Sequence, residues 1–288
     1  MEKMVKIIST NSVIPISVTG NYCELSCKHC NKRYLNSMFN IDDEEIIKII
    51  KDTKRKYLLI SGGTLKNGSV PIFTKLDKIK IIKENDVILN AHTGYIPEEY
   101  FLDIFLFDSI SIDIVGSDRI IKEIYNLNLD LEYFYTNLIK LKEYIENYNC
   151  INNNEKNKPL IIPHITIGLY YGSSSFEEKA IDFVSKLSTE KLVLNILIPT
   201  KNTYFQNIEN ISIDRIVEIY YYARAKLPNT IIYLGCMRPF GEYRDKVDTK
   251  LLEIGIDGLV NPSKNLLRKI EDSNYFSFEK KDGCCALI

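Results

Sequence analysis

The 288-residue sequence contains no tryptophan, only three histidines, and no run of about 18 uncharged apolar residues. Without such a run, no transmembrane span is expected. Its 37 basic and 38 acidic residues are well mixed and give a net charge of −1, so no broad basic surface for nucleic acid is expected. Seven cysteines is an odd number, and the N-terminus lacks a long apolar signal region. These absences favour a cytoplasmic protein with reduced thiols.

The composition is that of an ordinary globular protein. Hydrophobic residues make up 45% of the chain and charged residues 26%, which is enough for one sizeable core. No internal repeat and no interdomain linker is visible. We therefore expect a single domain over residues 1–288, with a cysteine-containing tail from about residue 271 to residue 288.

Short β-branched runs alternate with longer amphipathic stretches along the chain. Eight such units in about 250 residues have the size and order of an α/β fold, the (β/α)8 TIM-type barrel, whose parallel strands are apolar on both faces. A partial barrel of six strands with an appended C-terminal unit is the alternative. The polar segment 149–159 is predicted to be a surface loop. The predicted strands are 14–19, 57–61, 87–91, 109–114, 161–168, 192–198, 231–235 and 257–261, and the clearest helices are 42–53, 130–148, 176–187 and 214–227.

Three cysteines follow the first predicted strand with the spacing C-x3-C-x2-C. They are Cys23, Cys27 and Cys30, with no fourth cysteine nearby. A cubane 4Fe-4S cluster takes one thiolate per iron, so three thiolates would leave one iron open, whereas structural zinc sites favour four closed ligands. Zinc completed by His29 or by a distant residue is the alternative, and a disulfide is a weaker one.

This spacing, with the aromatic-type residue His29 before the last cysteine, resembles the signature of the radical S-adenosylmethionine (SAM) superfamily. The resemblance implies a 4Fe-4S cluster and SAM as cofactors. In that family the amino and carboxylate groups of SAM chelate the open iron. An electron from the cluster then cleaves the sulfonium and yields a 5′-deoxyadenosyl radical.

Two further segments at predicted strand ends resemble SAM-binding motifs of that family. Ser61, Gly62 and Gly63 are similar to the Gly-Gly-Glu segment that contacts the SAM amino group, with Thr64 in place of the glutamate. Asp113 resembles the carboxylate that holds the SAM ribose hydroxyls in biotin synthase. The alternatives are a plain strand-to-helix turn for the glycines and a helix N-cap for the aspartate.

The fifth predicted strand is similar to the G-x-I-x-G-x-x-E stretch that lies along the adenine in many radical SAM proteins. The likeness implies that Ile165 packs against the adenine and that Gly168 gives it clearance. His164 stands where the first glycine would be. His164 and His92, which ends the third strand, can each be structural or functional.

The C-terminal part adds an arginine and three cysteines. Cys236 and Arg238 follow the seventh strand and are predicted to be catalytic, because an arginine at a barrel mouth can clamp a carboxylate of the substrate or of SAM. Cys236, Cys284 and Cys285 form a second set of three thiols. They predict an auxiliary iron–sulfur cluster or a sulfur relay. The alternative is one core cysteine and a disordered, reactive tail.

Over nearly its whole length the chain resembles the biotin synthase-like group, which is similar to one subunit of the two-protein lipoyl synthase. This implies sulfur insertion into a protein-bound octanoyl chain, with an octanoylated carrier protein, a second radical SAM subunit and an electron donor such as ferredoxin as partners. The cysteines that hold the second cluster of biotin synthase have no counterparts here. The alternatives are another radical SAM chemistry on a small-molecule substrate, such as rearrangement or C–C bond formation, and a non-catalytic iron–sulfur or zinc protein.

Overall fold

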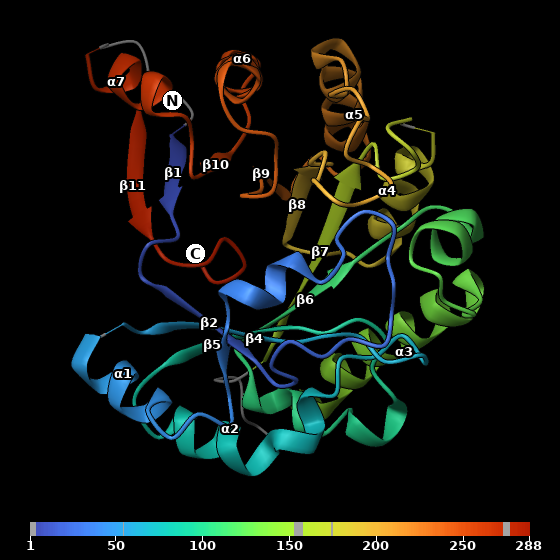
Figure 1. Cartoon of the computed structure of the whole chain (residues 1–288), viewed down its shortest axis with the longest axis vertical. Coiled ribbons are helices and arrows are strands. Elements are labelled where there is room, and N and C mark those ends of the chain that lie inside the picture. Colours follow the sequence, from blue (N-terminus) through green and yellow to red (C-terminus); the bar gives the residue numbers. More distant parts are fainter. Residues whose placement is uncertain (1–3, 54, 153–157, 174, 273–276) are drawn as a thin grey trace.

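A single parallel sheet of 11 strands forms the centre of the described structure and curls into a half-barrel with helices on its outer side (Figure 1). The computed structural model describes residues 4–53, 55–152, 158–173, 175–272 and 277–288. Strand order is β11-β1-β10-β9-β8-β7-β6-β5-β4-β2-β3. The strands are β1 (Val5–Ser9), β2 (Val13–Ser17), β3 (Phe39–Asn40), β4 (Tyr57–Ser61), β5 (Ile88–His92), β6 (Ser109–Asp113), β7 (Leu160–Ile167), β8 (Lys191–Ile196), β9 (Ile231–Leu234), β10 (Gly258–Val260) and β11 (Phe278–Asp282).

Seven α-helices and several short helical turns connect the described strands. No helix in this part of the chain is both long and apolar enough to cross a membrane. The α-helices are α1 (Ile46–Thr53), α2 (Leu76–Lys83), α3 (Leu131–Asn152), α4 (Glu177–Lys186), α5 (Ile213–Lys226), α6 (Glu242–Glu253) and α7 (Lys264–Asp272). The short turns are η1 (Arg33–Ser37), η2 (Ile72–Lys75), η3 (Glu98–Tyr100), η4 (Asp103–Leu106) and η5 (Ile120–Ile124).

The α/β barrel expected from the sequence is confirmed in its open form. All eight predicted strands are present, as β2 and β4 to β10, and the four predicted helices correspond to α1, α3, α4 and α5. Three strands were not predicted: β1, β3 and β11. The expected loop 149–159 is helical up to Asn152, the end of α3, and residues 153–157 lie outside the described residues.

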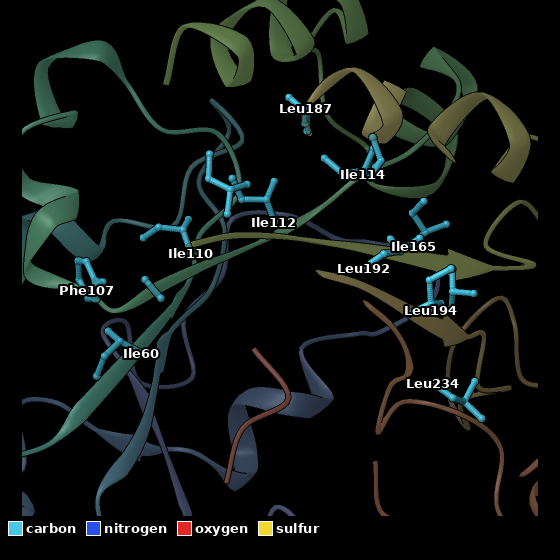
Figure 2. Close-up of a cluster of buried hydrophobic side chains, with 14 of the residues drawn as sticks. Ile60, Phe107, Ile110, Ile112, Ile114, Ile165, Leu187, Leu192, Leu194 and Leu234 are labelled. Carbon is cyan, nitrogen blue, oxygen red and sulfur yellow. The ribbon is translucent and has the colours of Figure 1, made fainter. Parts of the chain in front are cut away.

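The two faces of the curled sheet differ in polarity. Ile60, Ile110 and Ile112 point outward into the large core beneath the helices, where Figure 2 shows them together. Ser109 and Ser111 alternate with these isoleucines on β6 and so point to the inner side. The inner side of the half-barrel is therefore partly polar, which suits a site for a polar ligand.

The C-terminal tail folds into the space that the sheet encloses. After β11, which pairs with β1, the Gly283 amide donates to the Ser9 carbonyl (2.8 Å) and the chain turns inward. The C-terminus accordingly lies between the two arms of the sheet in Figure 1. Cys285 and Ala286 are buried in a cluster with five residues of the sheet: Ile8, Ile162, Val193, Tyr233 and Val260.

Candidate active site

The three-cysteine loop lies at the carboxyl ends of the strands, between β2 and η1. The Cys23 thiol lies 3.6 Å from the Thr64 carbonyl that follows β4, and the Cys27 thiol lies 3.6 Å from the Tyr125 carbonyl that follows η5. The Lys28 amide donates to the Ile124 carbonyl (2.8 Å). Two neighbouring connections therefore hold the loop at the barrel mouth, where barrel enzymes place their chemistry.

The glycine pair after β4 is explained by the approach of this loop. The Gly63 amide donates to Thr19 Oγ1 (2.7 Å), and that hydroxyl donates to the Tyr22 carbonyl (2.8 Å). A Cβ at Gly63 would lie 1.9 Å from the Tyr22 oxygen and 2.5 Å from Cys23 Cα. Gly63 thus lets the cysteine loop pack directly on β4. The contact to a SAM amino group that was expected of Ser61, Gly62 and Gly63 stays a prediction.

The thiols of the loop fit an iron–sulfur cluster. All three are half-buried, and the hydrogen bond between Cys27 and Cys30 is the largest cause that lowers the pKa of Cys30 to about 7 and raises that of Cys27. Within the described residues, no three Cys, His, Asp or Glu side chains are spaced to hold one metal ion. A zinc ion needs ligands that converge on one point, whereas a cubane binds each thiolate through a different iron. The donor set and its spacing suit the cubane.

All three histidines of the chain surround Asp113 at the end of β6. His92 Nε2 lies 3.4 Å from Asp113 Oδ2, and the ring of His92 stacks on that of His164 with 5.4 Å between centroids. His29, from the cysteine loop, also acts on Asp113 electrostatically. The side chain of Asp113 is 48% exposed, because it faces the open mouth of the half-barrel. The cluster joins the cysteine loop to the barrel interior.

Burial and charge act in opposite directions on these groups. Although its side chain is half-exposed, partial desolvation by the surrounding protein alone would raise the pKa of Asp113, but the charge and hydrogen bond of His92, helped by His164 and His29, lower it to about 2. Burial likewise opposes protonation of His92, yet Asp113 outweighs it and raises the pKa of His92. Burial lowers the pKa of both His164 and His29 to about 4. At neutral pH the site therefore contains one carboxylate and two neutral imidazoles, and the third imidazole, that of His92, has its pKa raised above the ordinary value. The ribose contact expected of Asp113 stays a prediction.

We expect His164 to make the fold sensitive to acid. The unfolded chain takes up this proton near pH 6.5 and the folded chain only near pH 4, so the unfolded state binds more protons in that window. Stability should fall by about 3 kcal/mol as the pH drops from about 7 to about 4. Urea unfolding of wild type and His164→Asn across this range measures the difference. Equal pH slopes in the two proteins would contradict the assignment.

Ile165 does not line the cofactor site as expected. His164 points inward to His92, so its neighbour Ile165 points outward and lies in the core beneath the helices with Leu192 and Leu194 (Figure 2). This corrects the predicted adenine contact, because Ile165 occupies the outer face of the strand. Gly168 adopts φ +81°, and its amide donates to Glu177 Oε1 (2.7 Å), so Gly168 is placed to shape the end of β7.

Arg238 is fully buried, and its donors are engaged within the protein. Nε and Nη2 bind the two carboxylate oxygens of Asp248 (2.6 and 3.0 Å). Nη1 donates to the carbonyls of Gly235 and Val260, and Nη2 also donates to that of Asn261. These bonds use all five N–H groups of a guanidinium. The structure therefore corrects the expected role: Arg238 joins β9, β10 and α6 and has no donor left for a substrate carboxylate.

Removing the partner of this buried guanidinium should be costly. Asp248→Ala leaves Arg238 charged and unpaired, and we expect it to lower the free energy of unfolding by about 3–5 kcal/mol. The double variant Arg238→Met with Asp248→Leu should recover much of that loss, because it removes both charges. Urea unfolding measures both. Recovery of the fold by the double variant without recovery of activity would restore a catalytic role for Arg238.

The second set of thiols also comes together. Cys236 and Cys284 pack against the buried cluster that contains Cys285, on the inner side of the sheet. Cys284 Sγ lies 3.6 Å from Asn90 Nδ2, two residues before His92 on β5. Sequence reasoning missed Asn90, although polar residues at alternating strand positions were a signal for a lined interior. Whether the three thiols hold a cluster stays a prediction.

A separate cleft of about 940 Å³ lies where β1 and β10 end and α6 and α7 begin. Arg244, Asn261 and Lys264 are among its lining residues, and none of the three loop cysteines is. This cleft lies apart from the cluster of Asp113 and the histidines. The candidate active site is at that cluster, because the titratable groups and the thiols converge there.

No known family model and no curated protein matches the chain. Solved structures do. The hydrogenase maturase HydG from Carboxydothermus hydrogenoformans matches at 16% identity over 89% of this chain and 59% of HydG, with a TM-score of 0.61. Hydroxymethylglutaryl-CoA lyase from Pseudomonas aeruginosa matches at 11% identity over 91% and 78%, with a TM-score of 0.55. Streptococcus suis SuiB matches at 12% identity over 96% and 58%, with a TM-score of 0.53, and was also solved with S-adenosylmethionine.

These similarities establish the partial α/β barrel. The chain spans less than two thirds of HydG and of SuiB. A hydrogenase maturase and a hydroxymethylglutaryl-CoA lyase share this fold, so the fold does not by itself identify the reaction. The reaction has to be argued from the cysteine loop and the groups around it.

Proposed function

We propose that this chain is a radical SAM enzyme that binds a 4Fe-4S cluster through Cys23, Cys27 and Cys30 and cleaves S-adenosylmethionine reductively. The observation that carries the proposal is the placement of this loop at the mouth of a partial barrel, beside Asp113 and the three histidines. A bare electron carrier has no need of such a group of polar side chains beside its cluster. A cluster held there would supply the electron for SAM cleavage.

The protein's own residues have separable parts in this proposal. Gly63 and Thr19 hold the loop against β4, so that its thiols keep a fixed geometry. Asp113 presents a carboxylate that can accept the two hydroxyl hydrogen bonds of a ribose diol, while His92 holds its orientation. Asp113 raises the pKa of His92 and so favours its protonated form, which suits a proton donor.

The finer proposal is sulfur insertion into a protein-bound octanoyl chain, together with a partner subunit and an electron donor such as ferredoxin. It is supported by the three thiols of Cys236, Cys284 and Cys285, which lie inside the half-barrel rather than on its surface. We adopt the sulfur-relay interpretation of these thiols, with the auxiliary cluster as the alternative.

Anaerobic reconstitution with iron and sulfide tests the proposal. With dithionite and SAM, we expect about four irons per chain and formation of 5′-deoxyadenosine. About eight irons would favour an auxiliary cluster over the relay. Zinc retained in place of iron, with no deoxyadenosine, would overturn the proposal. For the finer one, an octanoylated carrier protein should yield a sulfur-containing product that disappears in the triple variant C236S/C284S/C285S. Deoxyadenosine is measured alongside, so that a general loss of activity is recognised.

A further inference from the structure

We propose that Cys284 is the nucleophilic thiolate of a Cys–His–Asp arrangement with His92 and Asp113, and that it accepts sulfane sulfur from a persulfide donor. The inference rests on the proposed function only for the later fate of that sulfur. The thiol chemistry itself needs neither SAM nor a cluster. It begins from the unusual position of the C-terminal tail inside the half-barrel.

The tail holds Cys284 on the inner side of the half-barrel, against Asn90 of β5. Hydrogen bonds fix the tail at both ends: the Gly283 amide donates to Ser9, and the Tyr233 hydroxyl donates to the Ile288 carbonyl (3.2 Å). Between them the Leu287 amide donates back to the Cys284 carbonyl (2.8 Å). Cys285 next to it is 6% exposed, whereas Cys284 is only half-buried. Of the two adjacent thiols, Cys284 is thus the accessible one.

A buried hydrogen-bond network points a donor at the Cys284 sulfur. The hydroxyls of Ser109 and Ser111 donate to Asn90 Oδ1 (2.8 and 3.0 Å), and these three side chains are almost completely buried. Because the oxygen of the amide is occupied by two donors, its nitrogen must face the other way, toward Cys284 Sγ (3.6 Å). Sulfur is the acceptor in this contact, and an N–H donor stabilises a thiolate more than a thiol.

His92 completes the arrangement from the same strand. Asn90 and His92 are two residues apart on β5, so both point to the inner side. His92 acts electrostatically on Cys284, and Asp113 Oδ2 lies 3.4 Å from Nε2 of the imidazole. A nucleophile beside a base that is held by a third group is the arrangement that activates thiols in enzymes.

The charged and titratable groups facing Cys284 agree with a thiolate. The pKa of Cys284 is lowered to about 7, and the largest cause is the hydrogen bond from Cys285. Burial acts in the opposite direction and would raise this pKa, whereas Asn90 and His92 lower it further. Cys236 approaches from the end of β9, and burial raises its pKa, so it remains a thiol. The side chain of Lys191, on β8, interacts electrostatically with both tail cysteines.

Sulfur transfer suits these surroundings better than acyl transfer. Cys284 packs against a cluster of apolar side chains that also contains Cys285 and contacts Cys236, whereas acyl transfer calls for a preorganised pair of N–H donors at a developing oxyanion. The Cys284 thiolate would attack the terminal sulfur of a persulfide R–S–SH. The donor S–S bond breaks, a new one forms, and R–S⁻ leaves and takes a proton from His92. The products are Cys284–S–SH and R–SH, with no net oxidation.

Thiol reactivity of the full-length, reduced protein tests this inference. Iodoacetamide alkylation of the Cys284 peptide is followed by mass spectrometry across pH, and glutathione persulfide serves as the sulfur donor. We expect an alkylation midpoint near pH 7 and one sulfur atom added at Cys284. His92→Asn should slow both reactions at neutral pH by about fivefold, which corresponds to a rise of one pKa unit from a midpoint near pH 7.

Two further variants separate the roles of the neighbours. Asn90→Ala should also slow alkylation, whereas Asn85→Ala, which removes an amide bonded to the Ile81 carbonyl at the end of α2 (2.9 Å), should not. A Cys284 midpoint at the ordinary thiol pKa, or no effect of His92→Asn, would overturn the inference. So would iron content that falls when Cys284 is replaced by serine, because the thiols would then be cluster ligands. Failure of SAM cleavage alone would affect only the proposed function.

Discussion

Serine in place of Cys23, Cys27 or Cys30 is expected to lower SAM cleavage by more than about a hundredfold. Substitutions that only disturb the support of a metal ligand already cost about 10–100-fold, so loss of a ligand itself should cost more. Each thiol has its own position: Cys23 faces the Thr64 carbonyl, and Cys27 faces the Tyr125 carbonyl. Another thiol therefore cannot take its place. Iron per chain and 5′-deoxyadenosine per hour are the two measurements.

Cys150→Ser is the matched control, because it removes the one cysteine to which we assign no role. It should retain iron and SAM cleavage at the wild-type level. If a single loop variant retained full iron and full cleavage, the cluster would have to be placed elsewhere. If all loop variants retained zinc instead, the electron-transfer role would fail as a whole.

Periodicity identified the strands because each is a short β-branched run that is buried on at least one face. It did not identify which face each residue occupies at the barrel mouth. Ile165 was predicted to face the interior, but its neighbour His164 occupies that face. Which of the two faces inward is set by the pairing with β6, where Asp113 is opposite His164. A single sequence contains no signal for that register.

The remaining differences depend on contacts that are distant in sequence. Arg238 was predicted to bind substrate because the sequence does not show its pairing with Asp248. That aspartate lies on α6, and nothing in the sequence relates it to Arg238. β11 pairs with β1 across more than 250 residues, and this pairing directs the tail cysteines inward. The cysteine loop, by contrast, was predictable, because its three cysteines are close together in the sequence and ligation of an iron–sulfur cluster requires such a spacing.

The second large effect is expected at Gly63. Gly63→Ala places a methyl group 1.9 Å from the Tyr22 carbonyl and 2.5 Å from Cys23 Cα, and both are backbone atoms that cannot move independently of the loop. We expect the loop to shift away from β4. The overpacking should cost about 1–3 kcal/mol of stability, and iron binding should fall by about tenfold or more. Urea unfolding and iron content measure the two effects separately.

Gly62→Ala is the matched control, because the same methyl group there meets only side-chain atoms, with Val18 Cγ2 at 3.0 Å and Thr19 Oγ1 at 3.1 Å. A small rotation of Val18 and a shift of Thr19 by a few tenths of an ångström, which leaves its hydrogen bonds to Gly63 and Tyr22 in place, can relieve these contacts, so we expect less than about 1 kcal/mol and near-normal iron binding. Gly62 would then be free to report on SAM: a raised KM for SAM with normal iron would indicate that its backbone contacts the ligand. Equal iron loss in both variants would show that the glycine pair does not hold the loop through the contact at Gly63.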